Sequence, residues 1–153
     1  SSQMRSKVLG SASSPTSPTA NTLLAALPAD LRAVMKSCTK YTDNKGAAIP
    51  PATCPLPRIY LFLLSEYEVF ATHQYCNDAE PNYQAQYDYF KAGNSKVANK
   101  HSATGTAAVW WLRSPYSSYV YYTSCSFCAV SSSGSLDYNN ANNAYGVVPG
   151  FVV

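Results

Sequence analysis

The C-terminal third, residues 110–153, decides what we expect of the fold. It opens with WWLRSP (110–115) and closes with GVVPGFVV (146–153), and both ends read as core strands. Between them, residues 116–145 carry Asp137 as the only charge and contain no Lys, Arg, His, Glu, Gln, Met or Trp. Such Tyr, Ser and Asn content is typical of antibody contact loops, where Tyr supplies area and small polar residues supply adaptable hydrogen bonds. We therefore expect the rest of the chain to support this surface.

Composition bounds the class of protein. The 153 residues suit one domain, and 12% charged residues is low against a typical quarter. The net charge of +3 is scattered, without a basic stripe, so nucleic acid is not expected as a partner. No apolar run approaches the roughly 18 residues of a membrane span, so no membrane insertion is expected. The opening SSQMRSK lacks a signal-peptide core and an initiator Met, and we expect the chain to be the C-terminal part of a longer protein.

The cysteines give little evidence for a metal or a redox centre. There are five of them: Cys38, Cys54, Cys76, Cys125 and Cys128. Cys125 and Cys128 form a CxxC, but a structural zinc site needs a second such pair or two histidines, and His73 and His101 stand far apart. A thioredoxin-like pair sits at a helix N-terminus, whereas this one lies in a Ser/Tyr-rich stretch. We expect buried or incidental thiols and no metal, and leave open whether any disulfide forms.

The first 42 residues read as short helices joined by a Ser/Thr/Pro loop. Residues 3–9 predict a helical turn, and Asn21 is a plausible N-cap for a helix over residues 22–27. Residues 28–42 predict a longer helix, because Pro28 suits a first turn. Its apolar stripe at i, i+3, i+4 and i+7 consists of Leu31, Val34, Met35 and Cys38. We expect this helix to pack on a sheet.

A strand and two helices are predicted in the middle of the chain. RIYLFLL (58–64) is apolar throughout and predicts a central strand. The S-x-x-E pattern that follows is a capping box, so a helical turn is expected over 65–70. Glu66 and Glu68 are then interpreted as cap and dipole partners rather than as acid–base groups. Residues 81–92 predict a further helix that ends at a glycine.

The strand AVWWLRS should direct Trp110 and Trp111 to opposite faces of a sheet. Arg113, in the same strand, is interpreted as a structural ion-pair or hydrogen-bond anchor below the polar surface, and a role in ligand binding is less favoured. SFCAVSS and SLDY predict a hairpin with Gly134 in its turn. The inward anchors of this hairpin would be Phe127, Val130 and Leu136. Pro149 limits the closing strand to an edge or a bulge.

Several motifs resemble one family. WWLRSP, V-x-S-x-G-S-L, NNAN and GV-x-PGF resemble the diversified C-terminal region of diversity-generating retroelement variable proteins. LFLLSEYEVF, NYQAQYDYFKAGNSKV and KHSATGTAA resemble the scaffold of the same group. The resemblance implies an α+β, C-type-lectin-like fold, with short helices packed on a small mixed or antiparallel sheet and a loop-rich C-terminal binding face. It further implies one domain over residues 1–153, with the scaffold in about 1–109 and the diversified region in about 110–153.

The resemblance also implies a function. Members of this group serve as receptor-binding modules of phages and prophages, so the expected partner is a protein or glycan on a bacterial cell surface. The expected location is the virion (phage tail) or the bacterial surface, and a homotrimer is compatible with the full-length protein. In such systems the replaced adenines often lie in Asn codons of the AAC or AAT type, where substitution never yields Lys, Glu, Gln, Met or Trp, and residues 116–145 contain none of these five.

Carried over position by position, the resemblance divides the C-terminal third into two sets. The diversified, ligand-binding set would be Tyr116, Tyr119, Tyr121, Tyr122, Ser124, Ser126, Ala129, Ser131, Ser133, Asp137, Tyr138, Ala144 and Tyr145. The scaffold set would be Trp110, Trp111, Arg113, Phe127, Val130, Gly134, Leu136 and Phe151. Relatives often carry a basic residue where this chain has Val148, which puts a salt link at that point in doubt.

Two other functions stay open. The fold class includes formylglycine-generating enzymes, which use a cysteine pair, but Cys125 and Cys128 lie inside the diversified window. No Ser/His/Asp set, paired acids or phosphate loop supports an enzyme, so no catalytic residue and no cofactor is expected. A structural virion or pilus-tip subunit is the other alternative. Asp137 is the lone acid beside several Asn residues, too few ligands for a calcium cage, so calcium-independent binding is expected.

Overall fold

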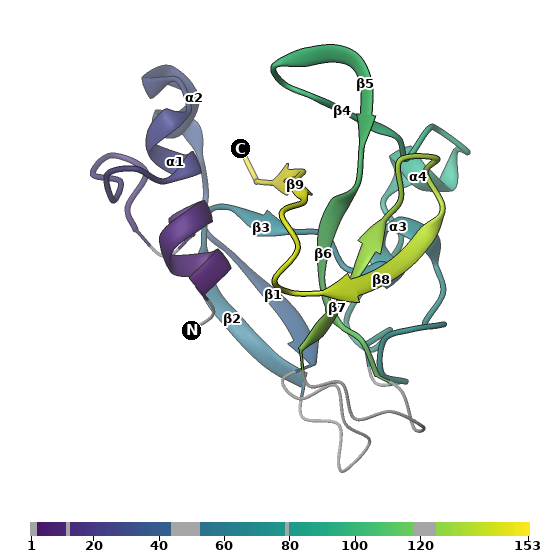
Figure 1. Cartoon of the computed structure of the whole chain (residues 1–153). Helices are drawn as coiled ribbons and strands as arrows, with labels where there is room; N and C mark the ends of the chain where they lie inside the picture. Colours follow the sequence, from purple (N-terminus) through teal and green to yellow (C-terminus); the bar gives the residue numbers. More distant parts are fainter. Residues whose placement is uncertain (1–2, 12, 44–52, 79, 118–124) are drawn as a thin grey trace. The chain divides into compact units, whose positions relative to one another are not determined.

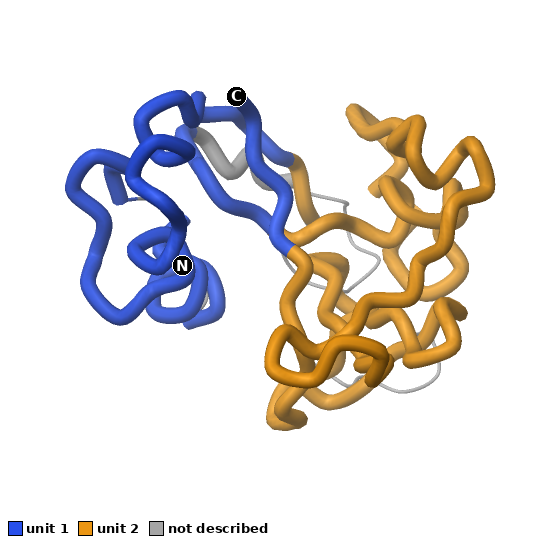
Figure 2. Tube along the Cα trace, turned by 90° about the horizontal axis from the view of Figure 1, so that it is seen from above, with its two compact units in different colours: residues 1–40, 55–62, 149–153 blue, residues 41–54, 63–148 orange. Residues whose placement is uncertain are grey.

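The computed structural model describes residues 3–11, 13–43, 53–78, 80–117 and 125–153 (Figure 1). It is an α+β protein of short helices and small sheets. The chain divides into two compact units, coloured separately in Figure 2. Unit 1 comprises Ser1–Lys40, Pro55–Phe62 and Pro149–Val153, and unit 2 comprises Tyr41–Cys54 and Leu63–Val148. In the described part of the chain, no helix has the length and apolar character needed to cross a bilayer.

Unit 1 contains three short helices. The predicted first turn is a π-helix, η1 (Met4–Leu9), followed by α1 (Leu23–Ala26) and α2 (Ala29–Val34). Thr22, rather than the predicted Asn21, caps α1, because its hydroxyl oxygen accepts a hydrogen bond from the amide of Ala25. The apolar core of this unit contains the buried side chains of Leu9, Leu24, Met35, Ile59, Leu61 and Phe62.

The prediction of one helix over residues 28–42 is wrong. Helix α2 ends at Val34, whose side chain is exposed, and strand β1 (Cys38–Asp43) follows. Strand β1 pairs with β2 (Thr53–Ile59) in a two-stranded sheet. The sequence of β1, CTKYTD, is rich in β-branched and aromatic residues, which favour a strand once a partner is available. The apolar spacing of residues 31–38 therefore matched a helical period without forming one.

The predicted strand over 58–64 is broken in two. Strand β2 ends at Ile59, and β3 (Phe62–Leu63) is a separate short strand that pairs with β10 (Pro149–Gly150). Arg58 has a positive φ of 53°, which bends the backbone at the end of β2. The apolar character of this stretch is nevertheless buried as expected, since Ile59 and residues 61–64 are all in the core.

Unit 2 is organised on a four-stranded sheet in the order β8-β7-β6-β9 (Figure 1). Its strands are β6 (Trp110–Pro115), β7 (Ser126–Val130), β8 (Leu136–Asn140) and β9 (Gly146–Val147). Strands β6, β7 and β8 are antiparallel neighbours, and β9 runs parallel to β6 with Trp110 opposite Gly146. The predicted hairpin is confirmed, with Val130 opposite Leu136 and Gly134 at φ 85° in its turn. Both tryptophans are buried, so both faces of β6 are covered.

The helices described in unit 2 are short. Helix α3 (Glu66–Phe70) begins at the predicted capping box, where Ser65 and Glu68 exchange side-chain-to-backbone hydrogen bonds. The helix predicted over 81–92 is only α4 (Asp88–Lys91). The segment before α4 turns its polar groups toward α3 instead: the Tyr87 amide donates to the Glu68 carbonyl oxygen, and the Gln86 side chain donates to the Val69 carbonyl oxygen. A tertiary contact thus replaces the helical hydrogen bonds.

Two further segments complete the fold. Strands β4 (Ala98–Lys100) and β5 (Ala103–Ala108) form an antiparallel hairpin. The closing stretch forms only the two-residue strands β9 and β10, because Pro149 has no N–H for a longer ladder. Phe151, assigned to the scaffold from sequence, is 41% exposed, and the two valines after it are also exposed. The expected core strand therefore does not extend through the last three residues.

Candidate binding surface

Two tyrosines from distant parts of the Tyr/Ser/Asn-rich stretch, residues 116–145, meet in unit 2. Tyr116 follows β6, where its amide donates to the Ser126 carbonyl oxygen at 3.0 Å, and Tyr138 lies in β8. Their rings stack with centroids 4.0 Å apart and planes within 10°. Tyr75, from the loop after α3, meets both rings edge-on, at 5.9 Å from Tyr116 and 5.0 Å from Tyr138. We call these three residues the tyrosine cluster.

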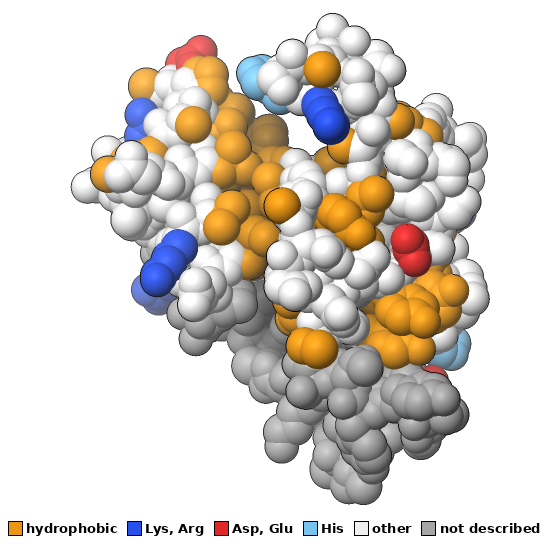
Figure 3. Space-filling view, viewed as in Figure 1, with side chains coloured by type: hydrophobic (Ala, Val, Ile, Leu, Met, Phe, Trp, Pro, Cys, Tyr) orange, Lys and Arg blue, Asp and Glu red, His pale blue; other side chains and the backbone are white. Residues whose placement is uncertain are grey.

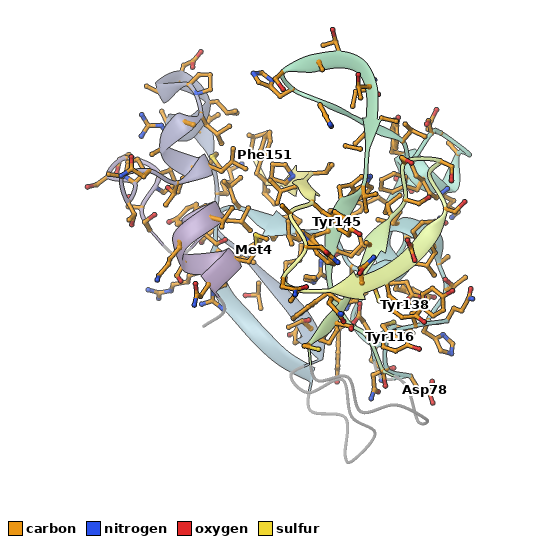
Figure 4. The ribbon with its side chains drawn as sticks, in the orientation of Figure 1. Met4, Asp78, Tyr116, Tyr138, Tyr145 and Phe151 are labelled. Atoms are coloured by element: carbon orange, nitrogen blue, oxygen red, sulfur yellow. The ribbon has the colours of Figure 1, made fainter. Side chains whose placement is uncertain are left out.

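The tyrosine cluster presents both apolar area and hydroxyl groups to solvent. Tyr138 is 40% exposed, and Tyr116 and Tyr75 are half-buried. In Figure 3, hydrophobic side chains gather on the part of this face where Figure 4 places Tyr116 and Tyr138. A side-chain hydrogen bond with Tyr116 raises the pKa of Tyr138, because ionisation would remove the shared proton. Tyr138 therefore keeps its hydroxyl proton at neutral pH.

Residues 139–145 are held in place by hydrogen bonds of asparagine side chains. Tyr145 packs on Trp111, with ring centroids 4.7 Å apart, and its hydroxyl oxygen accepts a hydrogen bond from Asn139 at 2.7 Å. The side-chain oxygen of Asn139 accepts in turn from the Asn143 side chain at 2.6 Å and from the Asn140 amide at 3.0 Å. The Asn-rich segment is thus held by short-range polar contacts, as expected of these residues outside regular structure.

The structure distributes the predicted contact residues unevenly. Tyr138, Ser133 and Ala144 are exposed, while Tyr116, Ser131, Asp137 and Tyr145 are half-buried. Tyr119, Tyr121, Tyr122 and Ser124 lie outside the described residues. Ser126 and Ala129 are buried, so their assignment as contact residues needs correction. The physical reason is that β7 lies between β8 and β6 and is covered on both faces, which leaves only Phe127 of this strand half-buried.

Tyr75 is the member of the tyrosine cluster that was not predicted from the sequence. Its loop is held by the fully buried side chain of Glu66, whose carboxylate accepts hydrogen bonds from the amides of Gln74 (2.6 Å), Tyr75 (3.2 Å) and Cys76 (2.8 Å). Glu66 lies in the first turn of α3, as its dipole role requires, and it also supports a loop. Only its position in the capping-box turn is visible in the sequence, and no spacing pattern links it to a loop eight residues later.

Arg113 is the predicted structural anchor. Its guanidinium forms an ion pair with Glu68, in which both side chains are almost fully buried. It also donates to the carbonyl oxygens of Leu63 (2.8 Å) and Tyr41 (3.1 Å) and to the side-chain oxygen of Gln84 (3.0 Å). Its N–H groups thus donate to oxygen atoms from several separate segments of unit 2, and these bonds hold β6 in place.

Cys76, Cys125 and Cys128 are free thiols. Cys125 is exposed, whereas Cys128 is buried and its sulfur donates to a Glu66 oxygen at 3.5 Å. Burial, with the neighbouring Glu66 and Glu80 carboxylates, raises the pKa of Cys128 well above its ordinary value, and burial likewise raises that of Cys76. These buried thiols stay protonated. Within the described ranges, no group of three or more His, Cys, Asp or Glu residues is placed to hold a metal ion.

Comparison with known proteins places the chain in a family. Residues 20–153 match the model of a "Domain of unknown function (DUF6273)". Neither the comparison with curated proteins nor that with solved structures found a match. The matched range includes every described residue of the tyrosine cluster, both support residues Glu66 and Arg113, and the whole four-stranded sheet. The chain therefore belongs to the DUF6273 family.

Proposed function

We propose that this protein is a ligand-binding module of C-type-lectin-like fold, with a Tyr/Ser/Asn-rich surface that is replaced by a diversity-generating retroelement. Its partner would be a protein or glycan on a bacterial cell, and its place the tail of a phage or the bacterial surface. No catalytic role is proposed. The observation that carries the proposal is the tyrosine cluster, in which Tyr116 and Tyr138 meet although 21 intervening residues separate them.

The chemistry of the tyrosine cluster suits binding. A tyrosine offers large amphipathic area with few rotatable bonds, so little conformational entropy is lost when it is covered by a partner. Asp137 and Ser133 lie in the β7–β8 hairpin, which also carries Tyr138, and supply polar groups like those at the rim of a protein interface. The framework beneath is hydrogen-bonded to main-chain atoms through Glu66 and Arg113, so exchange of surface side chains leaves those bonds in place.

A cell-binding assay tests the proposal. Labelled protein is titrated onto cells of the host bacterium, and binding by a Tyr116→Ala/Tyr138→Ala variant is compared with that of the parent. Loss of an anchor is worth about 2 kcal/mol or more, so affinity should fall about 30-fold or more. Tyr89→Ala is the matched control, because Tyr89 is also exposed but packs on Phe90, outside the tyrosine cluster.

Two further arms sharpen the result. Protease treatment of the cells should abolish binding to a protein receptor, and periodate treatment should abolish binding to a glycan. Undiminished binding by the double alanine variant would contradict the proposal. A second, independent check is genomic: a near-identical repeat of the coding segment for residues 110–153, differing only at adenines and lying beside a reverse transcriptase, is expected. Its absence would remove the diversification part of the proposal.

A further inference from the structure

We infer that Tyr75, which lies outside the diversified window, is a constant contact residue of the binding surface, and that the buried Glu66 is the residue that positions it. The inference rests on the proposed function and adds to it a fixed part of the site. It means that the surface combines replaceable side chains with at least one aromatic ring supplied by the scaffold.

The first step is the placement of Tyr75 against the window. Its ring lies edge-on to Tyr116 and to Tyr138, so it touches residues that precede and follow strand β7. Its carbonyl oxygen accepts a hydrogen bond from the amide of Ser117 at 2.7 Å. A ligand that covers the Tyr116–Tyr138 pair would therefore meet the half-buried Tyr75 ring at the same place.

The second step is the way Glu66 holds this loop. Its carboxylate accepts hydrogen bonds from three consecutive main-chain amides, those of residues 74–76, and from the hydroxyl of Thr72 at 3.2 Å. These bonds involve main-chain N–H groups, so they fix the path of the loop whatever its side chains are. A carboxylate buried in this way without its donors would be costly, which favours a single loop conformation.

The third step links the loop to the sheet. The Cys128 sulfur in β7 donates to the same Glu66 carboxylate, and the Glu66 amide donates to the Ser114 hydroxyl oxygen in β6 at 2.8 Å. Glu66 thus joins the loop that carries Tyr75 to strands β6 and β7. Because Glu66 is fully buried, it acts on a ligand only through the position of Tyr75.

The test uses selected binders, because these provide a defined ligand. The chain is displayed on yeast with Tyr116, Ser133, Asp137, Tyr138 and Ala144 randomised, and binders are selected against egg-white lysozyme as the probe. Tyr75→Ala is then introduced into several unrelated binders. We expect affinity to fall about tenfold or more, equal to about 1.4 kcal/mol, in most of them. Tyr75→Phe, which keeps the ring, should retain affinity within about threefold.

Glu66→Gln tests the positioning role. It should weaken the same binders at a temperature where the variant is fully folded, and the amides of residues 74–76 should lose hydrogen-exchange protection. Val69→Ala, in the same helix, is the control: it removes buried apolar contacts but none of these hydrogen bonds, so it should lower stability and leave both readouts unchanged. Should Glu66→Gln fail to fold, Thr72→Val removes one bond to the same carboxylate and should change both readouts in the same direction.

The outcomes separate the two proposals. Binders that all tolerate Tyr75→Ala would overturn the inference and leave the proposed function intact. Unchanged affinity and unchanged amide protection in folded Glu66→Gln would overturn the positioning role alone. A library that yields no binder, although the displayed protein is folded, would count against the binding function itself and against the inference with it.

Discussion

Replacement of Arg113 by Ala should destabilise unit 2 strongly. The Arg113 and Glu68 side chains are only 7% and 4% exposed, and removal of one partner from a buried ion pair costs about 3–5 kcal/mol. The change also leaves the carbonyl oxygens of Leu63 and Tyr41 without these donors, at about 1–3 kcal/mol for each group that stays unsatisfied. Water entering the vacated space will satisfy part of this loss. We therefore expect about 4–5 kcal/mol in total.

Urea denaturation followed by circular dichroism measures this loss, and calorimetry gives the matching change in melting temperature. At this chain length, 4–5 kcal/mol corresponds to about 8–20 °C. Arg113→Met combined with Glu68→Leu should recover the part of the loss that comes from the unpaired charge, because both charges leave the interior together. The carbonyl oxygens of Leu63 and Tyr41 still lack these donors, and the Glu68 half of the capping box costs about 1 kcal/mol more.

The exposed contact between the His73 imidazole and the Asp78 carboxylate, at 3.9 Å, supplies the control. Asp78→Ala should change the free energy of unfolding by less than about 0.5 kcal/mol, as expected of a solvated pair. A loss of under about 1 kcal/mol for Arg113→Ala would refute the reasoning, since it would place the Arg113 network in the same class as a surface salt bridge. A double variant no more stable than the single one would refute the attribution to an unpaired buried charge.

Three further predictions concern reactivity, pH and backbone conformation. Iodoacetamide should label exposed Cys125 in the native protein and buried Cys128 only after unfolding, as mapped by mass spectrometry; rapid native labelling of both would contradict the assigned burial. Because the pKa of Tyr138 is raised in the folded state above its ordinary 10.0, its contribution is fully present below that pH and is lost as pH rises through the folded value. Stability measured by urea titration should accordingly fall in alkali, less steeply in Tyr138→Phe, and an identical slope would count against the hydrogen bond between Tyr116 and Tyr138. Gly10→Ala should lower the melting temperature more than Gly93→Ala. Both glycines have a positive φ, so either change adds about 1–2 kcal/mol of backbone strain. Only at Gly10 would the added Cβ also meet a side chain, that of Thr22, at 2.5 Å.

The sequence predicted best what is set by local chemistry. The capping box before α3 and the glycine turn of the β7–β8 hairpin depend on residues close in the chain, and both formed as expected. Arg113 was also identified correctly, because a lone cation inside an apolar strand requires partners wherever the rest of the chain lies.

The failures came from contacts distant in sequence. The helix expected over residues 28–42 gave way to β1, because pairing with β2 outweighed a short apolar stripe. Ser126 and Ala129 were assigned to the contact set by the family resemblance, but their strand has neighbours on both sides and is covered on both faces. Tyr75 was not predicted because its loop is held by the carboxylate of Glu66, which belongs to helix α3. Sequence spacing carries no record of such a contact.

The parallel pairing of β9 with β6 has a consequence for engineering. Trp110 lies opposite Gly146 and Trp111 opposite Val147, and the Gly146 amide donates to the Val109 carbonyl oxygen at 2.9 Å. The stretch from Leu112 to Tyr145 therefore leaves and re-enters the framework at adjacent points. A segment whose ends are fixed side by side can be exchanged as a cassette when its replacement keeps Arg113 and the buried strand β7, because the rest of it need only span the same short gap.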